Sequence, residues 1–334
     1  YDNLAKRHGV KVVKDSAVGI DLDKRVLKLA SGATLAYDRL VLSPGIEFLW
    51  DALPGLAKPG ARDKVLHAWK AGPQTVALRK QLEAMPDGGV YALTIPLAPY
   101  RCPPGPYERA CQVAHYFSRA KPKSKVLILD ANEDVTSKAA LFKKAWADRY
   151  KGIIDYRPRH SLTDVDAATG TLKFEFNDDI KADVLNVLPP QRAGDIAHNA
   201  GLTTANKRWC EVDWLTMESK AAKNVHILGD ALQVAPLMPK SGHMANQHAK
   251  VAAAAIVALM SGREPNPLPI YNNTCYSFVS ATEVVHVSSV HRYDAEKKTL
   301  LTVPGSGGLS DVASPVEGAY ALGWANNIWA DALA

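Results

Sequence analysis

The stretch Val90-Tyr91-Ala92-Leu93-Thr94-Ile95 opens the part of the sequence that decides the fold. It is a short apolar run of the kind that forms a buried strand, and a loop with five prolines follows it over residues 96–106. Apolar spacing then predicts an amphipathic helix over 107–120 and a second strand over 126–129. Strand, helix and strand in this order predict a doubly wound α/β chain with a parallel sheet.

The loop between these two strands lacks the glycines of a nicotinamide site. A dinucleotide-binding loop reads G-x-G-x-x-G, so that its backbone approaches the pyrophosphate and a helix N-terminus faces the negative charge. Here Gly105 is the single glycine in residues 96–106, and the five prolines have no N–H group to donate. We therefore expect a unit with the shape of a nicotinamide domain that does not bind NAD(P)H well.

The rest of the chain alternates strand and helix signals. The first 50 residues read as a β meander that includes apolar segments at 10–13 and 17–20. A long Ala-rich helix is expected over 242–260, with Ser241 as its N-cap. The C-terminal region is expected to hold strands near 284–290 and 300–303, followed by a tryptophan-bearing tail. Further strands are expected at 25–29, 34–36, 37–42, 172–176, 184–188 and 225–228.

Composition excludes several classes of protein. A length of 334 residues suggests two domains, or two with a small third. The net charge of +6 comes from scattered basic residues, so no nucleic-acid partner is expected. The longest apolar run, 251–260, is far shorter than the roughly 20 residues of a membrane span. Four cysteines without a C-x-x-C pair indicate neither a disulfide scaffold nor a zinc ribbon, and no metal site is expected.

The proline-rich loop presents the first candidate site residue, Cys102. Arg101 precedes it, and a guanidinium beside a thiol favours the thiolate. Glu108, at the start of the following helix, is a candidate acid or base. From the residues alone, Cys102 could equally be a small buried residue and Glu108 an ordinary helix-dipole partner. Cys111 and Cys210 are expected to pack rather than react.

A second candidate site follows the strand at 225–228. Asp230 could accept hydrogen bonds from sugar hydroxyls, and Gly229 permits close approach. Residues 238–242 then lead into the long helix, whose N-terminus together with Lys240 would attract an anionic group. Such chemistry suits a flavin, although a capped helix after a loop explains the same pattern.

Four segments closely resemble the flavoprotein subunit of the flavocytochrome c sulfide dehydrogenases. They are residues 100–110, 188–194, 238–242 and 273–277, and the resemblance extends over nearly all of the chain. It implies a disulfide-reductase-like α/β fold in which an FAD domain, 1–53 and 195–267, is interrupted by a nicotinamide-type domain. That second domain would be 54–194 and carry Cys102, and a small C-terminal α+β domain, 268–334, would meet the flavin and a cytochrome.

The resemblance also assigns roles to single residues. It implies that Cys102 and Cys275 form a redox-active disulfide over the flavin, with Glu108 as a nearby carboxylate and Trp324 as an aromatic residue close to the flavin. The remaining positions expected to bind FAD are Ala17, Ser43, Pro44, Gly45, Gly229, Asp230, Lys240, Ser241 and Gly242.

Two departures from the family pattern accompany the resemblance. The family opens with a strand, a G-x-G-x-x-G loop and a cysteine that carries covalent FAD, whereas this sequence begins at Tyr1 without them. We therefore expect the pyrophosphate grip and the covalent tether to come from a preceding segment. His243 stands where an aromatic residue is expected.

The implied function is periplasmic oxidation of sulfide to elemental or polysulfide sulfur, with electrons passed to a c-type cytochrome subunit in a heterodimer. Heme is expected only on that partner subunit. Two alternatives stay open: a sulfide:quinone oxidoreductase, which shares the fold, and a flavin-free subunit that docks a cytochrome. A nicotinamide-dependent disulfide reductase is disfavoured by the proline-rich loop.

Overall fold

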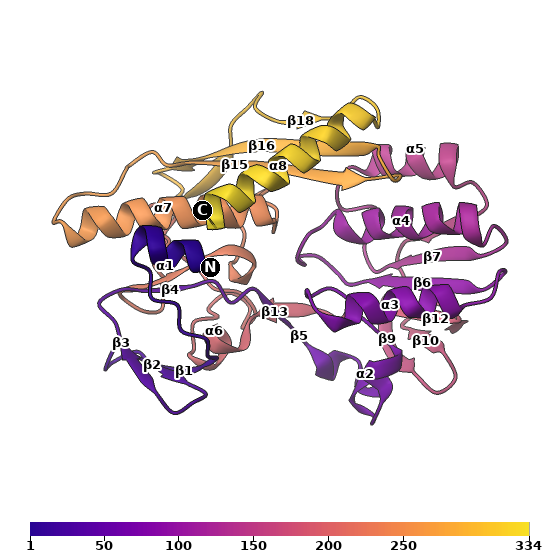
Figure 1. Ribbon diagram of the computed structural model, residues 1–334, viewed down its shortest axis with the longest axis horizontal. Helices are drawn as coiled ribbons and strands as arrows, with labels where there is room; N and C mark the ends of the chain where they lie inside the picture. The colour runs from indigo at the N-terminus through magenta and orange to yellow at the C-terminus, as the bar shows by residue number, and fades with distance from the viewer. Residues whose placement is uncertain (334) are drawn as a thin grey trace.

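A four-stranded parallel sheet organises one of the two lobes of the computed structural model, which describes residues 1–333 (Figure 1). Its strand order is β12-β6-β7-β8, and Val90 of β6 pairs with Lys125 of β7 in parallel register. The predicted strand–helix–strand unit is thus confirmed, with α4 as the connecting helix. These strands are β6 (Val90–Ile95), β7 (Lys125–Asp130), β8 (Ile154–Arg157) and β12 (Val184–Val187).

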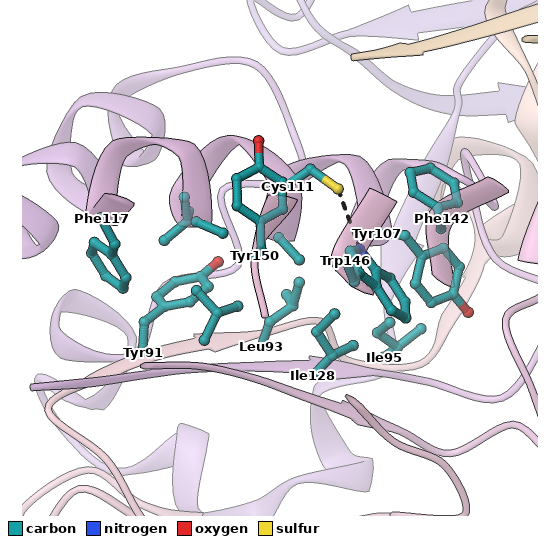
Figure 2. Packing of buried hydrophobic residues seen from close by; sticks show 14 of the residues in the cluster. Tyr91, Leu93, Ile95, Tyr107, Cys111, Phe117, Ile128, Phe142, Trp146 and Tyr150 are labelled. Atoms are coloured by element: carbon teal, nitrogen blue, oxygen red, sulfur yellow. Dashed lines mark hydrogen bonds between the residues drawn. The ribbon is translucent and has the colours of Figure 1, made fainter. Parts of the chain in front are cut away.

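The strands of this sheet are buried on both faces, which explains why β6 is apolar without interruption. Tyr91, Leu93 and Ile95 point into one core, and Ala92 between them points into the other. Figure 2 shows the first of these cores, in which the three β6 residues lie below the helical side chains. Three helices supply that side: α3 (Pro73–Ala84), α4 (Gly105–Ala120) and α5 (Ala139–Arg149).

A small antiparallel sheet covers the opposite face of the parallel sheet. Val165, Leu172 and Phe174 of this smaller sheet pack with Leu185 and Val187 of β12. Its strands run in the order β11-β10-β9, and three short helices within residues 50–64 complete the layer. The elements are β9 (Leu162–Asp166), β10 (Thr171–Phe174), β11 (Ile180–Lys181), η1 (Trp50–Ala52), η2 (Pro54–Ala57) and α2 (Ala61–Lys64).

The second lobe joins three small sheets to a long helix. β1, β2 and β3 form the predicted meander, β4 pairs with β14 in parallel, and β5 pairs with β13 in antiparallel register. The elements are α1 (Asp2–His8), β1 (Ala17–Asp21), β2 (Val26–Leu29), β3 (Thr34–Ala36), β4 (Leu40–Leu42), β5 (Ile46–Phe48), β13 (Gln191–Ala193), α6 (Asp195–Asn199), β14 (Val225–Ile227), η3 (Gly229–Ala231) and α7 (Gly242–Met260).

A C-terminal sheet lies across both lobes at the top of Figure 1, with α8 packed on it. Its strands reach two cores, because Tyr271 and Leu300 belong to the core of the second lobe whereas Val279 and Val285 belong to that of the first. The sheet therefore joins the lobes. Its elements are β15 (Ile270–Phe278), β16 (Val284–Asp294), β17 (Thr299–Thr302), β18 (Gly308–Leu309) and α8 (Pro315–Leu333).

The structure corrects three expectations about local structure. Residues 10–13 form no strand, because their apolar side chains remain exposed and meet no partner strand. The tryptophan-bearing tail is the helix α8, and the nine-residue strand β15 lies in a segment that had no strand signal. The division of the chain into three domains by residue range stays a prediction. No helix within residues 1–333 is both long and apolar enough to cross a bilayer.

Candidate active site

The N-terminus of α7 is the point to which the candidate residues converge. Ser241 caps the helix as predicted, because its Oγ accepts a hydrogen bond from the Met244 amide at 3.0 Å. The same hydroxyl donates to Oδ1 of Asn273 on β15 at 2.6 Å. The start of α7 is therefore fastened to the strand that carries Cys275.

The loops after β4 and β14 lie side by side, because these two strands are parallel neighbours. The Leu228 amide donates to the carbonyl of Leu42 at 2.8 Å, which brings Ser43 next to Gly229. Gly229 has a φ of 71°, and a Cβ there would lie 3.3 Å from that of Ala245 on α7. A glycine is thus required where loop and helix meet.

The loop after β4, Ser43-Pro44-Gly45, is also held from a second side. The Gly194 amide donates to the carbonyl of Gly45 at 3.0 Å, and a Cβ on Gly194 would lie 2.6 Å from the carbonyl oxygen of Pro44. Ala17, by contrast, begins β1 in the meander, and its expected contact with FAD stays a prediction.

Asp230 presents a buried carboxylate with one unused oxygen. Its Oδ2 lies 3.5 Å from Nε of Arg101, whereas none of residues 1–333 offers Oδ1 a hydrogen-bond partner. Burial raises the pKa of Asp230, and the charges of Arg101 and Lys240 oppose that rise. An unsatisfied buried oxygen is unfavourable, and a ligand hydroxyl would satisfy it. The residues at this edge therefore fit the sugar-alcohol chain of a flavin cofactor.

Lys240 is engaged by the protein itself. Its ammonium donates to the carbonyls of Asp230, at 2.9 Å, and Leu232, and lies 3.5 Å from the centre of the Trp209 ring. Burial lowers the pKa of Lys240 to about 7, the charge of Asp230 being the main opposing influence. These contacts rigidify the turn before α7, and a direct contact with flavin stays a prediction.

The loop that carries Cys102 is fixed at both sides of the thiol. The Arg101 amide donates to Oε1 of Gln191 at 2.9 Å, and the Cys102 amide donates to the carbonyl of Lys240 at 2.9 Å. Cys102 itself adopts a left-handed backbone with a φ of 56°, a strained conformation for a residue with a Cβ. This fastening places Cys102 directly beside the start of α7.

The expectation that Arg101 favours the Cys102 thiolate is wrong. Burial raises the pKa of Cys102 to about 12, and the charges of Glu108, Cys275 and Asp230 raise it further. Arg101 pairs with Asp230 instead, so its charge serves the neighbouring carboxylate. The Cys102 sulfur therefore rests as a neutral group and is poor as an initial nucleophile.

Glu108 and Cys275 are joined through β15. The Phe278 amide donates to Oε1 of Glu108 at 2.9 Å, and the Cys275 thiol lies 3.5 Å from Oδ1 of Asn273. Burial raises the pKa of Glu108, against the opposing effects of the Phe278 amide and nearby cations. A carboxyl group with a raised pKa is suited to proton transfer near neutral pH. All four cysteines are thiols here, so the Cys102–Cys275 disulfide stays a prediction.

Trp324 approaches the same region from α8. Its ring centre lies 5.6 Å from that of His243 in an edge-on arrangement and 6.4 Å from that of Tyr276. The Nε1 of Trp324 is buried, and no group within residues 1–333 accepts from it. His243 is oriented by β15, because its Nδ1 accepts from the Thr274 amide at 3.0 Å.

Sequence reasoning missed Lys138, which precedes α5. Its buried ammonium donates to the carbonyl of Cys275 at 2.9 Å and to Oγ of Ser277 at 2.8 Å. No motif marks this lysine, since its partners lie on a strand far along the chain. Cys111 and Cys210 are buried as expected, and Trp146 donates to the sulfur of Cys111 in the core of Figure 2.

The fold resembles solved structures of an oxidoreductase and a reductase over almost its whole length. It matches the sulfide:quinone oxidoreductase of Aquifex aeolicus with a TM-score of 0.71 and 16% identity, covering 95% of this chain and 74% of that one. It matches putidaredoxin reductase, in covalent complex with putidaredoxin, with a TM-score of 0.62 and 16% identity, covering 96% of this chain and 76% of that one. These likenesses define the class: a disulfide-reductase-like α/β fold.

Sequence comparison identifies the family within that class. Residues 75–189 match the central region of the sulfide dehydrogenase [flavocytochrome c] flavoprotein chain, and residues 267–333 match the flavin-binding region of flavocytochrome c sulphide dehydrogenase. The chain belongs to the family of flavocytochrome c sulfide dehydrogenase flavoproteins. The mitochondrial sulfide:quinone oxidoreductase of Dictyostelium discoideum is 24% identical over 236 residues, 66% of this chain and 50% of its own length. The chain spans about half the length of the curated relatives it matches.

Proposed function

We propose that the protein oxidises sulfide through a Cys102–Cys275 disulfide placed beside bound FAD. The observation that carries this proposal is the meeting of two distant cysteine segments at the start of α7. Cys102 is held by the Lys240 carbonyl, and Cys275 lies on the strand bonded to Ser241. The flavin-binding family match and the unused oxygen of Asp230 support a flavin at this place.

The disulfide divides the oxidation into two balanced steps. Attack of hydrosulfide on Cys102 breaks the bond to Cys275, forms a persulfide on Cys102, releases Cys275 as a thiolate and frees one proton. When the disulfide closes again, the outer sulfur leaves as elemental or polysulfide sulfur and two electrons are released. FAD, when bound, supplies a two-electron acceptor that can give up its electrons one at a time.

The remaining residues of the site control protons and position. Glu108 accepts the proton freed in the first step, because burial raises its pKa. The hydrogen bond from the Phe278 amide fixes its carboxylate against β15. Asp230 and the capped start of α7 orient the cofactor. Trp324 covers the site from α8, where its ring lies edge-on to that of His243.

The electron acceptor in this proposal is a c-type cytochrome subunit, bound as a heterodimer and carrying the only heme. The name of the matching family supports this acceptor. A disulfide that must persist between turnovers fits an oxidising compartment, and we place the protein in the periplasm. A covalent bond between FAD and a cysteine outside these 334 residues is part of the proposal, and mass spectrometry of the flavin peptide tests it.

A quinone is the second candidate acceptor, since the proteins that this chain resembles include sulfide:quinone oxidoreductases. The two candidates are distinguished by which acceptor reoxidises the sulfide-reduced holoenzyme. If a soluble quinone analogue reoxidises the sulfide-reduced holoenzyme and cytochrome c does not, the electron acceptor is a quinone.

An anaerobic titration of the purified holoenzyme tests the function. Sulfide is expected to bleach the flavin absorbance band, and NADH is expected to leave it unchanged because residues 96–106 lack the phosphate-binding glycines. Oxidised cytochrome c is then expected to restore the band. Bleaching by NADH would contradict the proposal, and so would a flavin band that does not respond to sulfide.

A further inference from the structure

Lys138 is a buried cation that points at the backbone of one reactive cysteine. Only 6% of its surface is exposed, and its ammonium donates to the carbonyl of Cys275 and to Oγ of Ser277. A lysine is rarely buried unless its charge is paired or bonded. Packing alone therefore does not explain why a positive charge is buried beside Cys275.

The backbone at Lys138 is strained in the same way as that at Cys102. Both residues have a φ of 56°, the left-handed region that residues with a Cβ avoid. Lys138 is the residue before α5, and its side chain makes no capping bond to that helix. Two residues with a left-handed backbone thus come from separate loops to this site, one carrying a sulfur of the pair and the other bonded to the backbone of Cys275, and such strain concentrates where a side chain must be held in one place.

The ionisable groups around Lys138 come from four elements. They are Cys102 on its loop, Glu108 on α4, Cys275 on β15 and Glu317 on α8, each of which favours the ammonium form when it is itself ionised. Burial opposes them and lowers the pKa of Lys138 to about 8. At neutral pH the side chain is therefore still a cation. The four acidic groups around it, if all were ionised, would carry more charge than the single ammonium can neutralise.

We propose that Lys138 is a positioning residue that stabilises the anionic sulfur released on Cys275 when the disulfide opens. The proposal deepens the proposed function and rests on it for the redox role of the cysteine pair. Opening of the disulfide creates two anionic sulfurs and one proton, so the site gains one negative charge once Glu108 holds that proton. The ammonium of Lys138 offsets this charge, and its bond to the Cys275 carbonyl holds β15 in place.

The substitution Lys138→Met removes the charge while keeping an unbranched side chain that is only one atom shorter. In the anaerobically reduced holoenzyme, iodoacetamide is expected to alkylate Cys275 about tenfold more slowly at pH 7 in this variant, since a neighbouring cation favours the thiolate. The midpoint potential of the cysteine pair is expected to fall by about 30 mV, the equivalent of tenfold for a two-electron couple. Peptide mass spectrometry assigns the alkylated residue.

Lys121→Met is the matched control. Lys121 is also a buried lysine, and its ammonium donates to the carbonyls of Leu82, Glu83 and Met85, away from the cysteines. It is expected to lower stability without changing either readout. Ser277→Ala removes one hydrogen bond of Lys138 but keeps its charge, so near-normal alkylation is expected. Equal slowing in Ser277→Ala and Lys138→Met would overturn the role of the charge.

The unmodified protein provides a measurement that does not depend on folding of a variant. Cys275 is expected to be alkylated before Cys102, because burial raises the pKa of Cys102 and the charge of Lys138 opposes that rise only in part. Alkylation of Cys102 first would overturn the proposal, as would unchanged rates in Lys138→Met. Failure of the proposed function is distinguished from failure of this inference by the sulfide titration, in which the flavin band of the wild-type protein would then not bleach.

Discussion

The amide of Phe278 donates a 2.9 Å hydrogen bond to the carboxylate of Glu108. This bond ties α4, which follows the Cys102 loop, to β15, which carries Cys275. The carboxylate of Glu108 and the segments that carry the two sulfurs are thereby held in one frame, although they come from different layers of the fold.

Replacement of either cysteine of the pair is expected to abolish turnover with sulfide. Cys102→Ser and Cys275→Ser each remove a sulfur that the disulfide requires, and a hydroxyl cannot form the persulfide. The measurement is the rate of flavin bleaching after anaerobic mixing with sulfide. Cys111→Ser is the control, because Cys111 lies in the core against Trp146, and it should keep the rate despite lower stability. Normal turnover in either active-site variant would exclude the disulfide mechanism.

Glu108→Gln is expected to reduce the rate of sulfide-driven bleaching about 100-fold, the typical contribution of a general acid or base. The amide oxygen can still accept from Phe278, so the position of β15 should be kept. The pH dependence of the rate is the decisive readout, because the limb that belongs to Glu108 should disappear. Glu133→Gln, on an exposed ion pair with Arg159, serves as the control. A pH profile unchanged from wild type would show that Glu108 transfers no proton.

Gly105→Ala is expected to lower the free energy of unfolding by about 2 kcal/mol, in the range of overpacking. An added Cβ would lie 2.7 Å from Cη2 of Trp69 and 2.9 Å from Sγ of Cys102, so the thiol must move. Urea unfolding and the bleaching rate should both show a loss. Gly323→Ala on α8 is the control, since its Cβ meets open space and alanine favours a helix. Equal stability of the two variants would contradict the packing argument.

Stability is expected to fall in acid because of His248. Burial lowers the pKa of His248 to about 3, with further lowering by the charges of Lys240 and His291, while the unfolded side chain titrates near 6.5. Between these values the unfolded state binds more protons, so the free energy of unfolding falls as the pH falls from about 6.5 towards about 3. Wild type should lose about 2 kcal/mol between pH 6.5 and 5 through this group.

His248→Gln should remove that part of the pH dependence. The Gly229 amide now donates to Nδ1 of His248 at 3.2 Å, and glutamine can provide an acceptor in its place. Urea unfolding at the two pH values, in wild type and variant, gives the difference directly. An identical loss of stability in both proteins would assign the acid sensitivity to other groups.

The sequence was informative where local signals and tertiary structure agree. The strand β6, the helix α7 and the Ser241 cap follow from apolar spacing and capping chemistry, and the structure contains all three. The prediction that Arg101 favours the Cys102 thiolate was wrong, because Arg101 adjoins Cys102 in sequence but pairs with Asp230 in space. Lys138 could not be found, because its role depends on contacts with Cys275 and Ser277, which lie on a strand that the sequence did not signal.

The C-terminal sheet spans both lobes, and this has a consequence for biosynthesis. Cys102 belongs to a lobe whose parallel sheet is complete once β12 has been made, whereas Cys275 arrives only with β15. During translation the nascent chain therefore holds Cys102 without its counterpart, and truncated products would never assemble the pair. The proposed sulfur chemistry would thus be withheld until the last strands have docked, and a ribosome that stalls early would yield a protein that lacks one of the two cysteines.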